Sequence, residues 1–109
     1  MFDPRLFVRR SILLRTTVGS EAAAQSMALR LVAPHLAACV HVHAVRSHYV
    51  WDGARRDEAE WVVEARVPLG RRVKRVRLAM LEGHPYELPV VESFGVFVNK
   101  PYLDWMRSG

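Results

Sequence analysis

Hydrophobic and polar residues alternate on both sides of Asp52-Gly53, and this alternation is the strongest pattern in the chain. An Asp-Gly pair is typical of a two-residue hairpin turn, because both positions tolerate a positive φ. If Trp51 and Ala54 flank the turn, the residue numbers of every cross-strand pair add up to 105. A slip of one residue would move every side chain to the opposite face. The sequence therefore predicts a long antiparallel hairpin over residues 38–67.

The two faces of this hairpin differ in chemistry. The apolar face carries Ala38, Val40, Val42, Ala44, Trp61, Val63, Ala65 and Val67. The polar face carries Cys39, His41, His43, Val45, Ser47, Glu58, Glu60, Val62, Glu64 and Arg66. Burial of apolar surface is favourable, so we expect the apolar face to pack against helices. The polar face is then left without cover within one chain, and the simplest cover is another copy of the chain.

Two segments have the hydrophobic spacing of amphipathic helices. The first follows Ser20, a favourable N-cap, and should end before Pro34, which disfavours a helical conformation at the residue before it. Its expected buried face consists of Ala24, Met27, Ala28 and Leu31. The second begins after Gly70 and ends at Gly83. Its expected buried stripe consists of Val73, Val76 and Met80.

Two further segments have strand character, and a short helix closes the chain. Residues 11–18 are rich in β-forming side chains and predict a strand that begins near Leu6. Residues 90–98 predict a fourth strand. Tyr102 and Trp105 are expected to anchor the closing helix against the sheet.

The order strand, helix, two strands, helix, strand indicates an α+β, ferredoxin-like βαββαβ fold with a C-terminal helix. In this fold one antiparallel sheet carries both longer helices on one face. We expect a single domain over residues 1–109, in which residues 1–10 form a tail and the start of the first strand.

Composition narrows the class of protein. Half of the residues are hydrophobic and 25% are charged, as in ordinary globular proteins. The single cysteine, Cys39, argues against a disulfide framework and fits a reducing cytoplasm. No apolar run approaches the ~20 residues of a membrane span, and the N-terminus lacks the apolar core of a signal peptide. The net charge of +5 permits an anionic partner without identifying one.

Catalysis and nucleic-acid binding lack a recognisable motif in this sequence. There is no Gly-x-Ser-x-Gly elbow, Gly-rich phosphate loop or His-Glu-x-x-His pair, so we do not expect an enzyme. Asp57, Glu58 and Glu60 follow Arg55 and Arg56 closely, which indicates charge pairing at the surface. Arginines also line one side of the second helix, but without the interleaved aromatic residues of a single-strand binder. We therefore expect a solvated face there.

Four ordered motifs resemble the signatures of the CutA divalent-cation tolerance family. They are Leu36-Ala37-Ala38-Cys39-Val40, Tyr49-Val50-Trp51-Asp52-Gly53, His84-Pro85-Tyr86-Glu87-Leu88-Pro89 and Tyr102-Leu103-Asp104-Trp105. The resemblance spans residues 11–107, and motifs in matching order are far more specific than any one of them. It implies a cytoplasmic protein that forms homotrimers similar to those of the PII signalling proteins. It also implies binding of copper or another divalent cation, with no established catalytic activity.

The chain departs from this family at the metal site proposed for it. Some relatives place a metal-binding cysteine where this chain has Thr16, and a second histidine where it has Gly83. Only His84 remains, as a candidate ligand for a metal ion or an anion. The alternative is that His84 caps the preceding helix or contacts a neighbouring subunit. The residues expected to fix the loop or make interface contacts, rather than to do chemistry, are Trp51, Tyr86 and Glu87.

The polar face of the hairpin offers a second candidate metal site. Cys39, His41 and His43 lie on one strand face with neighbours about 6.8 Å apart, and a thiolate with imidazoles suits copper or zinc. In the hairpin register Glu64 faces His41 and could orient its ring. The alternative is an ion pair between His41 and Glu64 at an interface, with Cys39 simply buried. A stable site would also need a third or fourth ligand that the sequence does not fix.

Two functions follow from these observations. The first is a CutA-like homotrimer that binds copper or another divalent cation, or acts as a PII-like sensing scaffold. The second is a structural or interaction scaffold whose clefts between subunits hold a small anion or a partner peptide. Titration with copper and zinc, beside adenine nucleotides, would separate the two.

Overall fold

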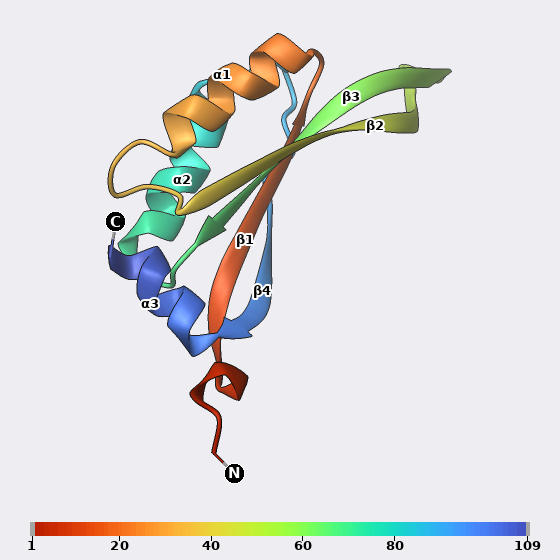
Figure 1. Ribbon diagram of the computed structural model, residues 1–109. Coiled ribbons are helices and arrows are strands. Elements are labelled where there is room, and N and C mark those ends of the chain that lie inside the picture. The colour runs from red at the N-terminus through yellow and green to blue at the C-terminus, as the bar shows by residue number, and fades with distance from the viewer. Residues whose placement is uncertain (1, 109) are drawn as a thin grey trace.

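The chain folds as a four-stranded antiparallel sheet with α1 and α2 packed on one face (Figure 1). The computed structural model describes residues 2–108, so Met1 and Gly109 lie outside it. The elements in chain order are η1 (Pro4–Leu6), β1 (Val8–Val18), α1 (Glu21–Leu31), β2 (Cys39–Trp51), β3 (Ala54–Val67), α2 (Arg71–Glu82), β4 (Glu92–Asn99) and α3 (Lys100–Ser108). The strand order is β2-β3-β1-β4, which confirms the ferredoxin-like α+β arrangement with a C-terminal helix.

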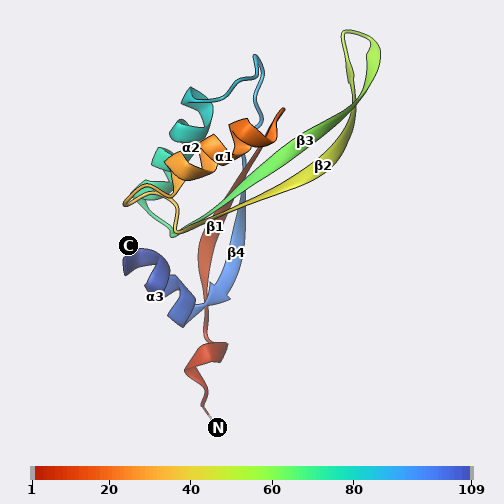
Figure 2. The same cartoon turned by 45° about the horizontal axis from the view of Figure 1, so that its top comes forward.

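The β2–β3 hairpin has the predicted register along its whole length. Its pairs run from Cys39 opposite Arg66 to Trp51 opposite Ala54. Asp52 has φ 49° and Gly53 has φ 74°, so both turn positions use the positive φ that a tight hairpin turn requires. Figures 1 and 2 show the tip of the hairpin projecting well beyond the helices. This projecting arm makes the chain elongated, with extents of 57 × 29 × 20 Å.

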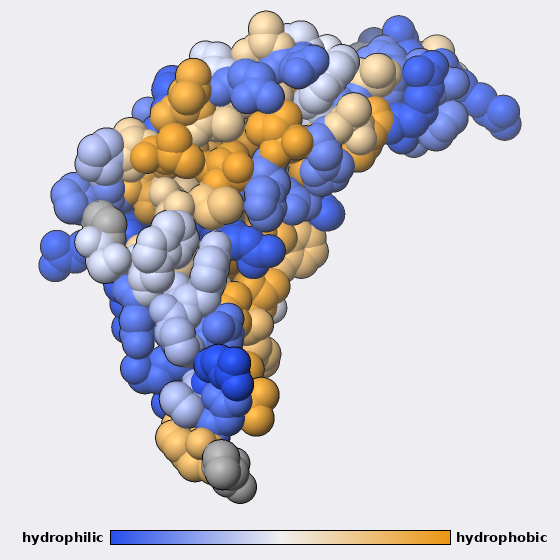
Figure 3. Space-filling model, viewed as in Figure 1, coloured by the Kyte–Doolittle hydropathy of each residue, from blue (hydrophilic) through white to orange (hydrophobic). Residues whose placement is uncertain are grey.

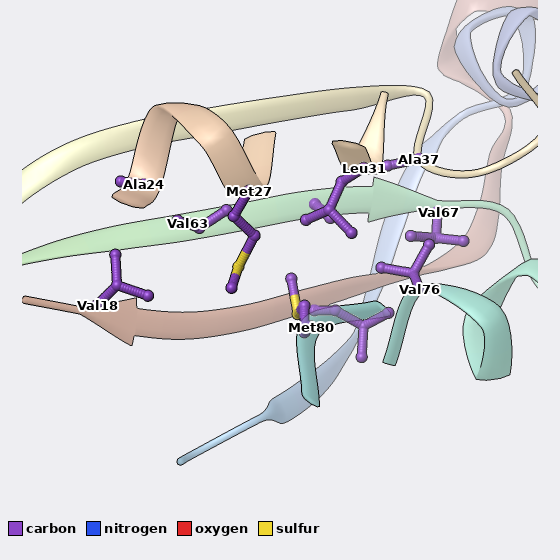
Figure 4. Close-up of a cluster of buried hydrophobic side chains, with 11 residues drawn as sticks. Val18, Ala24, Met27, Leu31, Ala37, Val63, Val67, Val76 and Met80 are labelled. Carbon is purple, nitrogen blue, oxygen red and sulfur yellow. The ribbon is translucent and has the colours of Figure 1, made fainter. Parts of the chain in front are cut away.

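The core lies between the two helices and the sheet (Figure 4). The predicted apolar faces supply it, because Val63 and Ala65 of the hairpin meet helix residues such as Met27 and Met80. Val40 and Val42 pack at its margin, as expected for the apolar face of β2. The buried residues of this core cluster are Leu14, Val18, Ala24, Met27, Leu31, Ala37, Val63, Ala65, Val67, Val76 and Met80.

Helix ends follow the signals in the sequence. The Ser20 hydroxyl accepts a hydrogen bond from the Ala23 N–H at 3.1 Å, which caps the start of α1. At the end of α2 the Gly83 N–H donates to the Ala79 carbonyl, although Gly83 has an ordinary φ of −96°. Glycine is needed at position 83 for packing and not for its backbone conformation, because the Arg30 guanidinium occupies the space that a Cβ would take.

The residues that pack α3 against the rest of the chain differ from those that the sequence predicted. Leu103 and Met106 are its buried residues, whereas Trp105 is 53% exposed. The prediction that Trp105 anchors α3 is therefore wrong, since Trp105 instead packs beside Tyr102 with ring centroids 5.3 Å apart. The Arg72 guanidinium of α2 donates to the Met106 carbonyl at 2.9 Å, so this arginine is a structural contact and not part of a solvated face. No helix within residues 2–108 is long and apolar enough to cross a lipid bilayer.

Candidate binding sites on the open face

The sheet face opposite α1 and α2, here called the open face, carries the polar side chains of the hairpin. Two groups of functional side chains lie on it at different places. The first is at the start of β2, around Cys39 and His41. The second lies between the hairpin and the loop of residues 84–90, where the structure forms a cleft of about 790 Å³. The two groups come from different parts of the sequence.

Cys39 and His41 are brought together on β2. The Cys39 Sγ lies 3.7 Å from the His41 Nε2, and the imidazole is exposed. Tyr102 adjoins this pair from α3, and its pKa is raised by burial and then by the neighbouring Cys39 thiol. His43 follows on the same face and is exposed. A thiol and an imidazole in contact are suitable donors for copper or zinc.

The described chain does not complete a metal site by itself. Among residues 2–108, no group of three or more His, Cys, Asp or Glu side chains is placed to hold one metal ion. Glu64 lies opposite His41 as the register predicted, but its ion pair is with Arg15, at 3.8 Å. Arg15 also binds Glu92 at 2.6 Å and covers the Phe94 ring at 4.8 Å. Any further ligand for Cys39 and His41 must therefore come from rearrangement or from another chain.

His84 has both of its ring nitrogens hydrogen-bonded within the chain. Its Nδ1 accepts from the Tyr86 N–H at 3.1 Å, and its Nε2 lies 2.9 Å from the Thr16 Oγ1. The Thr16 hydroxyl uses its only hydrogen to donate to the Val90 carbonyl, so the Nε2–H of His84 must be the donor to Thr16. Burial lowers the pKa of His84, which favours this neutral form. His84 therefore fixes the loop, and binding a metal ion would cost one of these hydrogen bonds.

Two tyrosine–glutamate pairs line the cleft between the hairpin and the loop. The Tyr86 hydroxyl donates to the Glu60 Oε2 at 2.6 Å, and the Tyr49 hydroxyl donates to the Glu58 Oε2 at 3.0 Å. Glu60 is only 8% exposed, so the expectation that it pairs with arginines at the surface is wrong. The loop brings Tyr86 over it and covers this part of the open face.

The two tyrosines are neutral donors in this arrangement. Burial raises the pKa of Tyr86 strongly, and its hydrogen bond to Glu60 raises it further. Burial also raises the pKa of Tyr49, followed by its hydrogen bond to Glu58. An ionised phenolate beside a carboxylate would be repelled, so the hydroxyls keep their protons and hold the carboxylates in place.

The structure groups the predicted site residues in two sets. Trp51, Tyr86 and Glu87 line the cleft, beside Glu58 and Glu60. His84 is the first residue of the same loop, and its ring centroid lies 5.1 Å from that of Tyr86. Cys39 and His41 form the other set. The sequence did not single out Tyr49 as a site residue. The hairpin register did place it on the polar face, and this was the available signal.

Comparison with known proteins gives one consistent result. The family model described as CutA1 divalent ion tolerance protein matches residues 12–109. The divalent-cation tolerance protein CutA of Thermus thermophilus is 33% identical over 100 residues, which cover 84% of this chain and 90% of that protein. The solved structure of CutA from Synechococcus elongatus is 29% identical and covers 97% of both chains with a TM-score of 0.87. CutA1 from Shewanella is 28% identical, covers 90% of this chain and 92% of its own, and has a TM-score of 0.82.

Proposed function

The chain belongs to the CutA1 divalent ion tolerance family, and we propose that it acts as a homotrimer that binds copper or another divalent cation. The role is one of binding rather than catalysis, in keeping with relatives that are named as tolerance proteins. The proposed location is the cytoplasm, where reducing conditions keep the Cys39 thiol available as a ligand.

The observation that carries the metal proposal is the contact between Cys39 and His41. A soft thiolate and an imidazole 3.7 Å apart form half of a four-coordinate set, and they are held on a regular strand that keeps their spacing fixed. His43 on the same face is the proposed third ligand, reached by rearrangement of its exposed side chain, because the described chain does not place three such groups around one ion. A metal ion bound there would not take part in catalysis. The protein would instead hold the ion or respond to its presence.

The proposed trimer is supported by surfaces that one chain leaves unpaired. In the described chain, β2 and β4 are the edge strands of the sheet, and such edges readily pair with other chains. Phe97 of β4 is 67% exposed, and the hairpin arm extends beyond the core of its own chain. Association of copies would cover these surfaces and could supply the missing metal ligands.

Metal analysis and light scattering on the untagged protein test both parts of the proposal. We expect a mass of three chains and a stoichiometric copper or zinc ion. The metal should be lost in the double variants Cys39→Ser/His41→Ala and His41→Ala/His43→Ala. The control is His48→Ala, which alters an exposed histidine on the hairpin arm and should keep the metal. Unchanged metal content in both double variants would refute the site, and a mass of one chain would refute the trimer.

A second candidate function rests on the cleft of about 790 Å³ between the hairpin and the loop. In this case the protein is a scaffold that binds a ligand other than a metal ion, with the cleft bordered by neighbouring subunits. The volume lies in the usual range for small-molecule sites. Calorimetric titration with copper, zinc and adenine nucleotides separates the two functions, because a scaffold of this kind would bind no metal ion stoichiometrically.

A further inference from the structure

We propose that the hairpin–loop cleft binds a small organic cation, an ammonium or guanidinium group on a short apolar stem. This proposal deepens the second candidate function and does not depend on the metal site. Its three supports are the shape of the cleft, its charge relative to the whole chain, and the arrangement of its aromatic rings and carboxylates.

The cleft has two walls, which the hydrogen bond from the Tyr86 hydroxyl to Glu60 joins at their inner end. One wall is the β2–β3 hairpin, whose regular pairing holds Tyr49 and Glu58 in place. The other wall is the loop of residues 84–90, which His84 ties to Thr16. The inner end of the cleft, at Tyr86 and Glu60, is therefore fixed, whereas the outer end, at Tyr49 and Trp51, lies on a two-stranded ribbon that a bound ligand would order.

The charge of the cleft opposes the charge of the protein. The chain has a net charge of +5, yet the cleft is lined by three carboxylates, those of Glu58, Glu60 and Glu87, against one guanidinium, that of Arg56. His48 also lines the cleft, and its Nδ1 lies 3.8 Å from the Oδ1 of Asp57, a further carboxylate. A region of negative potential on a cationic protein attracts a cation and discourages an anion.

Aromatic rings accompany the carboxylates in the cleft. Tyr49, Trp51 and Tyr86 all line it, and Tyr49 and Trp51 keep about two-fifths of their surface exposed. The face of an aromatic ring attracts ammonium and guanidinium groups, most strongly for tryptophan. Large exposed rings beside carboxylates are therefore a suitable surface for a cation with an apolar stem.

The hydrogen bonds in the cleft leave acceptors free and use up donors. Each tyrosine donates to the Oε2 of its glutamate, so the Oε1 atoms of Glu58 and Glu60 are left to accept from a ligand. No fully buried side-chain oxygen in the described part of the chain lacks a partner, so the Oε1 of Glu60 is open to solvent. Acceptors on charged carboxylates favour donors that carry positive charge.

Calorimetric titration of the untagged full-length protein with agmatine tests the proposal, since agmatine carries a guanidinium and an ammonium on a four-carbon stem. We expect saturable binding of one agmatine per chain. Glu60→Gln and Glu58→Gln should each weaken it about tenfold or more, because each removes a charge-assisted acceptor. Trp51→Leu, at an exposed position where folding is not at risk, should weaken it by a smaller factor.

The matched control is Glu92→Gln, which removes a carboxylate on β4 that is paired with Arg15. This variant should bind agmatine like the wild type. The double variant Cys39→Ser/His41→Ala should do so too, because it removes only the proposed metal ligands. Absence of saturable agmatine binding would refute the proposal, as would unchanged affinity in both glutamine variants at positions 58 and 60. Tight binding of ATP without binding of agmatine would refute it as well. Dissociation of the assembly by Glu58→Gln, with no cation bound by the wild type, would show that the cleft is a contact between copies.

Discussion

The two faces of the sheet are held by different kinds of interaction. On the helix-covered face, side chains such as Leu14, Val63 and Met80 are fully buried and contribute through apolar contact. On the open face the interactions are directed pairs, such as Arg15 with Glu92 and Tyr86 with Glu60. Figure 3 shows hydrophilic side chains gathered over the hairpin tip. Apolar burial gains its stabilising free energy from many residues together. The contribution of a polar pair depends on only two residues and on how exposed they are.

The largest effect should come from the helix-covered face. Met27 is 1% exposed, so Met27→Ala should lower the free energy of unfolding by about 2–5 kcal/mol through lost burial and a cavity. Leu29→Ala in the same helix is the matched control, because Leu29 is 73% exposed. It should change stability by no more than about 0.5 kcal/mol. Urea denaturation measures both, and equal effects would contradict the division between the faces.

The next effect should come from the buried pair of the open face. Tyr86→Phe leaves the Glu60 carboxylate without its hydrogen-bond donor, which should cost about 1–3 kcal/mol. Tyr49→Phe makes the same change at the exposed Glu58 pair, where water replaces the lost donor, and should cost far less stability. Both variants remove one tyrosine hydroxyl from one glutamate, at a part-buried pair and at an exposed pair. A similar loss of stability in both would show that burial does not decide the strength of these pairs.

A smaller effect should come from Arg15, which joins β1 to β4. Arg15→Gln removes its ion pairs with Glu92 and Glu64 and its contact with the Phe94 ring, at a cost of about 0.5–1 kcal/mol because the group is partly exposed. The loss should shrink as salt is added. Arg46→Gln, which breaks a more exposed pair with Asp57, is the control and should have almost no effect. A salt-independent loss for Arg15→Gln would point to packing rather than charge.

The smallest effect should come from pH, through His84 at the junction of the two faces. Burial lowers its pKa below the ordinary value of about 6.5, so the unfolded chain binds more protons than the folded chain just below that pH. The stability due to neutral His84 is therefore fully present above pH ~6.5 and is lost as pH falls through the window down to the folded pKa. His84→Gln should remove this part of the slope in denaturation curves recorded between pH 5 and 7.5, whereas His43→Gln should keep it. An unchanged slope in His84→Gln would contradict the assignment.

The sequence predicted best what depends on close neighbours. The hairpin register follows from the Asp52-Gly53 turn and a two-residue alternation, and the α1 cap follows from Ser20, so both were confirmed. Burial of Glu60 was missed because its partner Tyr86 is 26 residues away and reaches it through an irregular loop. Alternation fixes the face on which a residue lies, but it says nothing of which loop crosses that face. The same limit applies to Trp105, whose exposure depends on how α3 meets the rest of the chain.

The projecting arm has a consequence for local opening of the backbone. β1 accompanies β3 only as far as the pair Val18–Trp61, so the outer part of the arm is a ribbon of two strands. Two strands without a third are marginally stable in water. Amide protons should therefore exchange fastest near Asp52 and progressively more slowly toward Trp61. The exchange rate should drop sharply at Glu60, because the Tyr86 hydroxyl is hydrogen-bonded to its side chain. A molecule bound against the arm would slow exchange near Asp52 most and so reduce the difference in exchange rate along the arm. The exchange profile therefore reports whether the arm is bound.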